Sequence, residues 1–316
     1  MSTIVNTSLR NIITNKYDII LLFDVVCGNP NGDPDAANQP RQLHDGSGIG
    51  IVTDVCLKRK IRDMVMKLVQ RGELPEKEYD IYIQRGMTLD ARDLESVKEV
   101  GIADTDATAD DTTEVKQNLK ALAGTSKDKE LHDAMCKRYF DVRTFGNVPT
   151  LLSGTIHSRN VKGPVQFGIA KSVDPIHPED ISVFRCAVTK EEKADSHTTF
   201  GSKYIVPYGL YMCKIHVSAD EAEKTGFSEG DMQTLVKAMT DMFDDDYSSV
   251  RGEMNVRKLV VFKHESKHGN AHMSQLENLV DVHLRDGVVT PSSFRDYVVD
   301  VKADEAPEGV TVTEVV

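Results

Sequence analysis

The sequence predicts an α+β fold with a ferredoxin-like βαββαβ core, the arrangement that RNA-recognition domains also use. Apolar extended runs and amphipathic helical patterns follow one another in the order strand, helix, strand, strand, helix, strand. The 316 residues, 40% of them hydrophobic, are enough for a sizeable core in a single domain. The aromatic signature of ordinary RNA-recognition sheets (K/R-G-F/Y-G/A-F-V-x-F/Y) is absent, so any RNA must be held by a loop or a helix.

The first strand and the first helix are joined by a long loop. Tyr17–Val26 is a β-branched, aromatic-rich run typical of a strand. Thr53–Arg71 is predicted to be a helix ended by Gly72, because its apolar residues recur at helical spacing: Leu57, Ile61, Met64, Val65 and Leu68. The loop places Gly46, Gly48 and Gly50 just before this helix, where Ser47 or Thr53 would cap it. The unpaired N–H groups of the helix entry are a potential anion site.

The remaining elements follow the same two periodicities. Within an acidic insertion, Thr113–Ala123 and Lys129–Phe140 have amphipathic helical patterns, and Met232–Phe243 is the second core helix. The charged, Thr-rich run Thr189–Pro207 predicts a protruding hairpin or loop. The acidic tail from Lys302 is expected to be loosely ordered. Further strands are predicted at Val165–Val173, Phe184–Val188, Tyr208–Val217 and Val256–Lys263.

Charge is unevenly distributed along the chain. The net charge of −12 argues against a protein that coats nucleic acid indiscriminately. Yet residues 41–71 hold seven Lys/Arg against three Asp, and residues 137–171 hold six against the single Asp141. This segregation fits a polar surface with one basic groove.

The basic cluster of the first helix consists of Lys58, Arg59, Lys60, Arg62 and Lys67. Lys58 and Arg62 are i, i+4 neighbours on one face, with Arg59 beside them, and such a row suits consecutive phosphates. Arg41 and the glycine-rich helix entry would extend it into an anion track. A solvated basic face is the alternative interpretation.

Several other functions have weak support. The glycines form neither G-x-G-x-x-G nor a P-loop, and the five cysteines form no C-x-x-C pair. Asn29, Asn31, Asp33 and Asp35 alternate like calcium ligands but lack the required Gly and Glu, so turn chemistry explains them better. His264, His268 and His272 recur every four residues, but Gly269-Asn270 would break a helix there. Asp244–Asp246 is interpreted as a solvated helix end.

We find no charged-then-apolar leader and no apolar run long enough to cross a bilayer. A cytoplasmic protein without membrane contact is therefore expected.

Several separated motifs closely resemble those of one known family. They are NPNGDPDAANQPR followed by GIVTDVCLKRKIR (29–62), DVRTFG (141–146), GPVQF (163–167), YGLY (208–211), SSVRG (248–252), and FKHES with GNA (262–271). In sequence and in order, these motifs resemble those of the Csd-type backbone subunit of the type I-C CRISPR Cascade complex, a member of the RAMP superfamily.

The resemblance implies a modified RNA-recognition palm (16–72 and 165–303), a helical finger insertion (73–140), an RNA-groove connecting segment (141–164), a thumb hairpin (189–207) and a flexible tail (304–316), all in one domain. It also implies several copies stacked along one CRISPR guide RNA, with other Cascade subunits as partners and target DNA bound through guide pairing. No catalytic group, cofactor or metal is needed.

Carried over to this chain, the guide-gripping helix falls on Thr53, Lys58, Arg59 and Arg62. Phe200 is the thumb aromatic able to wedge between bases. The remaining expected RNA contacts are Arg41, Gly48, Gly50, Arg143, Arg159, Lys162 and Lys203.

Two rival functions stay open. Related backbone subunits of type III complexes cleave target RNA with an acidic residue after the first strand, where this chain has Asp33 or Asp35. The second rival is an oligomerising scaffold that makes no RNA contact.

Overall fold

The computed structural model describes residues 11–102, 125–147, 161–185 and 199–316. The predicted helix Thr113–Ala123 and the candidate residue Arg159 therefore lie outside the described residues, as does the side chain of Phe200.

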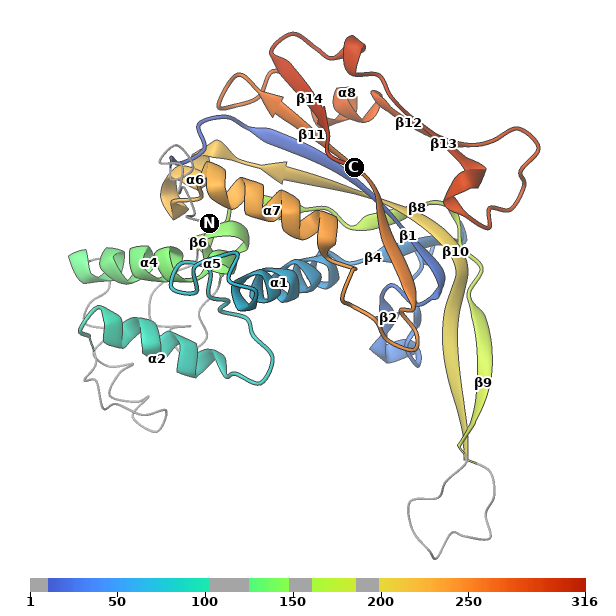
Figure 1. The fold of residues 1–316 in the computed structure, drawn as a ribbon, viewed down its shortest axis with the longest axis horizontal. Coiled ribbons are helices and arrows are strands. Elements are labelled where there is room, and N and C mark those ends of the chain that lie inside the picture. Colours follow the sequence, from blue (N-terminus) through green and yellow to red (C-terminus); the bar gives the residue numbers. More distant parts are fainter. Residues whose placement is uncertain (1–10, 103–124, 148–160, 186–198) are drawn as a thin grey trace, which may run out of the picture.

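An eight-stranded sheet forms the centre of the molecule (Figure 1). Strand β1 (Tyr17–Gly28) pairs antiparallel with β10 (Thr199–Val217) on one side and with β11 (Glu253–His264) on the other. The sheet order is β14-β11-β1-β10-β8-β4, and β7 and β9 also pair with β10. The predicted α+β class with a central antiparallel sheet is confirmed. The other strands of this sheet are β4 (Ile49–Val52), β7 (Val165–Phe167), β8 (Ala170–Pro175), β9 (Glu179–Arg185) and β14 (Val310–Glu314).

Two helices cover one face of the sheet, α1 (Asp54–Gln70) and α7 (Glu229–Asp241). Thr53 caps α1, and Ser228 with Asp231 forms a capping box at α7. The five apolar positions predicted for the first helix are all buried against alternate residues of β1. The short helix α6 (Ala219–Thr225) precedes α7 and was missed by the sequence reading.

The opposite face of the sheet is covered by the C-terminal part of the chain. Helix α8 (Met273–Glu277) and the hairpin of β12 (Val280–Leu284) and β13 (Tyr297–Val301) pack there. Ile20 and Leu22 of β1 point into these contacts, while Ile19, Leu21 and Phe23 point toward α1 and α7. Strand β1 is therefore buried from both sides, which explains its continuous apolar run.

The tail was predicted incorrectly. Residues from Lys302 form a 3-10 turn (Ala303–Glu305) and then β14, which pairs with β11 as the edge strand of the sheet. The alternation Val310, Val312 with polar residues between them supplies the strand pattern, and both valines pack against the C-terminal core. The many acidic residues of the tail concealed this two-residue strand periodicity in the sequence.

A buried carboxylate network anchors the start of β1. Asp18 accepts hydrogen bonds from His264 Nε2 at 2.8 Å and from the half-exposed His216, and it pairs with Lys16 at 2.9 Å. The backbone N–H of Asn270 donates to His264 Nδ1, which fixes the proton of that ring on Nε2. Burial alone would raise the pKa of Asp18, but the hydrogen bonds from these three side chains outweigh it and lower the pKa to about 2.

Because the pKa of Asp18 is lower in the folded protein than its ordinary value of 3.8, the unfolded state binds more protons between these values. The stabilisation of the folded state by ionised Asp18 is therefore present above its ordinary pKa of 3.8 and is lost as the pH falls toward 2. We expect Asp18→Asn to lower the free energy of unfolding by about 2 kcal/mol at pH 6 and by much less near pH 2.5. Urea unfolding across this range measures the difference, and a constant difference would contradict the assignment.

The three histidines noted in the sequence do not share a helix. His264 ends β11, His268 lies near Asp220, and His272 precedes α8. Within the described ranges, no three His, Cys, Asp or Glu side chains are grouped in a way that would hold a metal ion.

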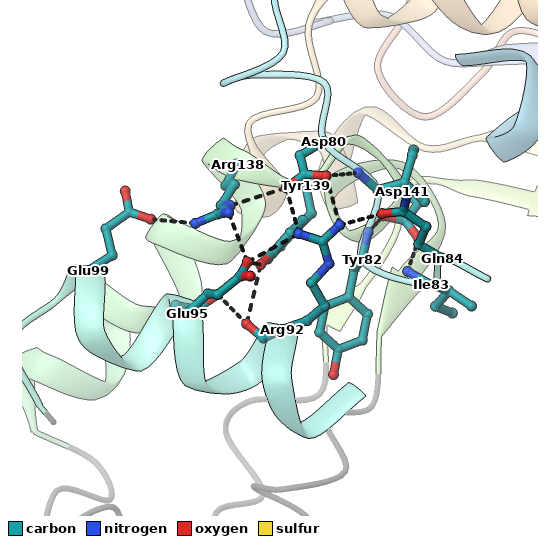
Figure 2. Close-up of polar contacts among 12 residues, drawn as sticks. Asp80, Tyr82, Ile83, Gln84, Arg92, Glu95, Glu99, Arg138, Tyr139 and Asp141 are labelled. Carbon is teal, nitrogen blue, oxygen red and sulfur yellow. Dashed lines mark hydrogen bonds and ion pairs between the residues drawn. The ribbon is translucent and has the colours of Figure 1, made fainter. Parts of the chain in front are cut away.

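The helical insertion contains α2 (Leu89–Glu99) and α4 (Ser126–Arg138), followed by the short helix α5 (Phe140–Phe145). Helix α2 was not predicted, and the predicted Lys129–Phe140 helix begins three residues earlier and breaks at Tyr139. Figure 2 shows the ion-pair network at the base of these helices. Arg92 binds both oxygens of Asp80 at 3.0 and 3.2 Å, and Arg138 reaches Asp80 and Glu95 at 3.3 and 2.8 Å. The network fixes α2 and α4 to the segment that leaves α1.

A long hairpin projects from the sheet (Figure 1). Its arms are β9 and the first part of β10, which pair from Glu179 with Ile205 to Arg185 with Thr199. The predicted hairpin at Thr189–Pro207 therefore begins about ten residues too late. Residues Phe184 and Arg185, predicted to lie in a strand of the core, belong to this hairpin. Strand β10 continues from the hairpin into the sheet as one 19-residue element.

The remaining short elements are β2 (Gly32–Asp33), β3 (Gln39–Pro40), β5 (Gly146–Asn147), β6 (Val161–Lys162) and 3-10 turns at Pro34–Ala36 and Phe294–Asp296. Among the residues that the structure describes, no helix has the length and apolar composition needed to cross a membrane.

Candidate nucleic-acid interface

The loop before α1 is built by turns and close packing. Asn31 Oδ1 accepts from both the backbone N–H and the hydroxyl of Thr53 at 3.0 Å, which holds the helix entry. The Gly50 N–H donates to Ser172 Oγ at 2.8 Å, and a Cβ on Gly50 would lie 2.7 Å from the Tyr211 hydroxyl. Gly48 has φ +73° and its carbonyl accepts from Gln42. Both glycines are therefore required by packing and turn geometry. Their predicted contact with RNA stays a prediction.

Asp33 and Arg41 also have local roles in this loop. Asp33 caps the 3-10 turn Pro34–Ala36 by accepting the Asp35 N–H at 3.2 Å, and Arg41 pairs with Asp33 at 3.3 Å. The interpretation of Asp33 as a turn residue is confirmed. A ribonuclease role for Asp33 or Asp35 stays a prediction, which incubation with complementary RNA and Mg²⁺ would test.

The cations of α1 are divided between two sides of the helix. Lys60 and Lys67 pair with Asp246 and Asp245, which follow α7, and Arg71 also reaches Asp245 at 2.6 Å. The acidic run 244–246 was predicted to be solvated. Asp244 and Asp245 are indeed exposed, but Asp245 and Asp246 are also partners of α1 and the residue that follows it, because the end of α7 lies beside that helix.

On the other side of α1, Lys58 lies over the ring of Phe145 at 5.8 Å and pairs with Asp54 at 3.0 Å. Arg59 donates to the carbonyl of Ile83 at 2.8 Å. These two side chains keep 13% and 23% of their surface exposed, so they lie at the edge of the solvent rather than on an open face.

Arg62 was predicted to contact RNA, but it is only 7% exposed. Its Nε donates to Asp141 Oδ2 at 2.7 Å, and the other Asp141 oxygen accepts the backbone N–H of Tyr82 at 2.7 Å. The Ile83 N–H completes the set at 3.1 Å. Asp141 therefore joins α1 to the segment that enters the helical insertion, and Arg62 is used for this joint. Its helical position next to Lys58 concealed the burial.

Arg143 is likewise buried, with 6% exposed. Its guanidinium donates to Asp231 Oδ1 at 2.7 and 3.1 Å and lies over the rings of Tyr79 and Phe140 at 4.9 and 5.3 Å. Burial acts to lower the pKa of Arg143, but the charge of the Asp231 carboxylate and its hydrogen bonds act in the opposite direction, and the pKa is raised. The prediction of Arg143 on an RNA groove wall is wrong about its exposure. The residue ties α5 to α7.

Lys162 is 72% exposed and pairs with Glu221 at 3.3 Å. Lys162 lies opposite Gly146 in the β5–β6 pair, and Gly146 directly follows Phe145 in the chain. Lys162 and Phe145 both line a hollow of about 460 Å³. The structure thus brings both Lys58 and Lys162 to the neighbourhood of Phe145. It does not bring Lys203 there, because Lys203 lies on the projecting hairpin opposite Ile181.

Sequence reasoning missed two features of this region. Asp141 is the single acid in the basic stretch 137–171, and that isolation was a signal for a buried ion pair. Phe184 lies directly opposite Phe200 in the hairpin and is 64% exposed, so the hairpin carries a second aromatic residue. The alternation of β9 was hidden by the assignment of Phe184 to the core.

The chain is similar in sequence to known proteins. A family model described as CRISPR-associated protein Cas7 matches residues 15–302. A CRISPR-associated protein Cas7 from Haloferax volcanii is 27% identical over 305 residues, which cover 91% of this chain and 81% of that protein.

Two solved structures are also similar. A chain of a pre-nicking CRISPR RNA-guided surveillance complex is 17% identical with a TM-score of 0.46, and the match covers 78% of each chain. A chain of another CRISPR RNA-guided surveillance complex is 13% identical with a TM-score of 0.42, covering 78% of this chain and 68% of that one.

The class is thus an α+β protein with a central antiparallel sheet, a helical insertion and a projecting hairpin. The chain belongs to the Cas7 family of CRISPR-associated proteins, since the family model spans most of its length.

Proposed function

We propose that this protein is a backbone subunit of a type I-C CRISPR Cascade complex that binds the guide RNA in several copies and presents it for pairing with target DNA. The observation that carries the proposal is the β9–β10 hairpin, which extends from the sheet with exposed Ile181 and Phe184. Exposed apolar side chains on a projecting hairpin are suited to contact an RNA or protein surface. Sequence choice is left to base pairing, so the subunit needs no catalytic group or cofactor.

The modified RNA-recognition palm is supported by strand order. The chain order β1, α1, β8, β10, α7, β11 is a βαββαβ sequence, and within the sheet β11, β1, β10 and β8 are consecutive. Both faces of this sheet are covered, one by α1 and α7 and the other by the C-terminal hairpin. We therefore place the guide outside the sheet, between the helical insertion as finger and the hairpin as thumb.

Lys58, over the ring of Phe145, and Lys162, which lines the same hollow as Phe145, are the proposed phosphate contacts at the palm, together with Arg59 of α1. Arg41, in the loop before α1, is proposed as a further contact. Lysine and arginine contacts to phosphates carry no base information, which suits a subunit that accepts any guide sequence. Arg62 and Arg143 support this surface indirectly by fixing α1 and α5. Lys203 and Phe200 are proposed to contact the guide from the thumb.

Co-expression with the other complex subunits and a CRISPR array tests the function. We expect a particle that contains several copies of this chain and one RNA of uniform length, protected from added nuclease. A nucleic-acid-free oligomer would favour a plain scaffold. Regularly spaced cleavage of complementary RNA with Mg²⁺, lost in Asp33→Ala, would favour the ribonuclease.

The palm contacts predict a specific salt effect. Lys58→Ala with Lys162→Ala should lower the slope of log affinity against log salt by about 0.7 per lysine for single-stranded RNA, because each lost contact releases fewer counterions. The loss should be similar for guides of different sequence. Fluorescence anisotropy over a salt series measures it. Lys302→Ala, an exposed lysine after β13, is the matched control, and an unchanged slope in the double variant would place the guide elsewhere.

A further inference from the structure

A buried carboxylate lies beside the point where β10 leaves the sheet and enters the projecting hairpin. Asp24 of β1 is 0% exposed. Its Oδ2 accepts hydrogen bonds from the Tyr208 hydroxyl at 3.1 Å and from Arg257 Nε at 2.8 Å, and its Oδ1 accepts one from Asn255 Nδ2 at 3.3 Å. Three donors from the two strands that flank β1 therefore converge on one carboxylate.

Arg257 reaches Asp24 because β11 is irregular at this position. The register of β11 against β1 passes directly from Lys258 to Val256, so Arg257 is an extra residue in its strand. A β-bulge of this kind re-aims a side chain that regular alternation would turn to the other face of the sheet. The guanidinium of Arg257 also lies over the ring of Phe294, 5.4 Å from its centroid, so the turn before β13 takes part in the same network.

Tyr208 lies at the root of the projecting hairpin. Strand β10 pairs with β9 up to Ile205 and with β1 from Val206 onward, so Tyr208 follows the exchange of partner strands by two residues. Its side chain belongs to a buried cluster with Tyr297 of the C-terminal hairpin. Burial, and then the charge of Asp24 and the hydrogen bond to it, raise the pKa of Tyr208, so the hydroxyl stays protonated as a donor. The bond to Asp24 therefore holds β10 just inside the sheet.

Charged residues at this place favour a role in direction over a role in stability. Burial of a carboxylate and a guanidinium costs desolvation, and apolar side chains of similar volume often stabilise a fold equally well. Charge-assisted hydrogen bonds add geometric specificity, because they form only at short range and in favourable angles. The hairpin needs a fixed root of this kind, since its described residues 179–185 and 199–205 contribute nothing to the four buried clusters.

We propose that Asp24 and Arg257 are positioning residues of the projecting hairpin. They hold Tyr208 and thereby set the direction in which β10 leaves the sheet. The inference rests on the proposed function, in which the hairpin is the thumb, and adds to it the residues that aim the thumb.

The test removes the polar network without leaving a buried charge unpaired. In a triple variant, Asp24→Leu, Tyr208→Phe and Arg257→Met replace the carboxylate and two of its donors by apolar side chains. The unfolding temperature of the purified subunit should change by less than about 4 °C, because a buried ion pair and its apolar replacement are close in stability. Tyr297→Phe is the matched control, since it removes a hydrogen bond of 2.7 Å between the C-terminal hairpin and Asp174 and leaves the Asp24 network intact.

The direction of the hairpin is measured as the distance between two nitroxide labels in the purified subunit. The labels are attached at Ser182→Cys on the hairpin and at Gln233→Cys on α7, both exposed positions, and Cys27 and Cys186 are replaced by serine in every sample. Double electron–electron resonance should give one narrow distance distribution for the unaltered network and for Tyr297→Phe. The triple variant should lose this narrow distribution and give a broad one.

A triple variant that keeps the narrow distribution would overturn the proposal. A lower unfolding temperature with unchanged distances would also overturn it, because a purely structural role gives that result. If the triple variant does not fold, Tyr208→Phe alone decides, since it removes a single hydroxyl from the network. A broadened distribution in Tyr208→Phe then supports the proposal, and an unchanged one overturns it.

Co-expression with the other complex subunits links the direction of the hairpin to assembly. The triple variant should yield less of the RNA particle than Tyr297→Phe, and an equal yield with broadened distances would overturn the role of direction in assembly. A wild-type subunit that forms no RNA particle would instead refute the proposed function and leave the distance result in place.

Discussion

Asp141→Ala is expected to lower the free energy of unfolding by about 3–5 kcal/mol, a large part of the stability of an ordinary domain. The substitution leaves the guanidinium of Arg62 buried without its carboxylate and removes the acceptor of the Tyr82 and Ile83 N–H groups. Each of these groups then bears its desolvation cost. Urea unfolding followed by circular dichroism measures the change.

A double-mutant cycle with Arg62→Ala isolates the pair. Arg62→Ala alone should cost less than Asp141→Ala, because Asp141 keeps its two backbone donors. The coupling between the two substitutions should exceed about 1 kcal/mol, as for groups in direct contact. Asp54→Ala is the matched control, since it breaks the more exposed pair with Lys58 and should cost less than about 1 kcal/mol. A small change in the free energy of unfolding of Asp141→Ala would show that the Arg62–Asp141 ion pair can be broken at little cost.

Shortening the hairpin is expected to abolish assembly on RNA while leaving the subunit folded. Ser182 and Ser202 face each other across the hairpin, so an Asn-Gly turn can join them and replace residues 183–201. The truncated arms contribute nothing to the four buried clusters of the described structure, whereas Val206 below them does. Recovery of the multi-copy RNA particle on co-expression should fall by about tenfold or more, because the base-stacking contacts of the thumb are lost.

The matched control for the shortened hairpin is the pair Ser182→Ala and Ser202→Ala in the full-length chain, which changes the joining positions without shortening the arms. This control should assemble normally and unfold at the wild-type temperature. A shortened subunit that still forms the particle in normal yield would show that the hairpin is not the thumb.

The core of the fold could be predicted where periodicity is strong. Strand Tyr17–Val26 and helix Thr53–Arg71 have bounds close to those of β1 and α1, because most of the apolar residues that define their periodicity are buried. The C-terminal hairpin β12–β13 and β14 could not be found in this way. Their strands are short and carry acids on the outward positions, so the pairing that orders them is set by residues far away in the sequence.

The candidate site was predictable in residue type but not in exposure. Lys58 and Arg62 occupy the same helix face in the sequence pattern, and their side chains are 13% and 8% exposed. Arg62 is nevertheless held in a buried ion pair with Asp141, whereas Asp54, the partner of Lys58, is 35% exposed. What decides the difference is Asp141, which is far from α1 in the chain and near it only in the fold. A helical pattern records the face of a residue and contains no information about which insertion will cover that face.

Strand β10 has a mechanical consequence for an assembled particle. The strand is one unbroken element of 19 residues, on the order of 60 Å, from the hairpin to the middle of the sheet. A pull on the hairpin along its axis would load the β1–β10 ladder lengthwise, from Gly28 paired with Val206 to Tyr17 paired with Val217. The hydrogen bonds would then share the load in shear and would not open one at a time. Tension between neighbouring subunits would thus be carried by the central β1–β10 strand pair of the sheet.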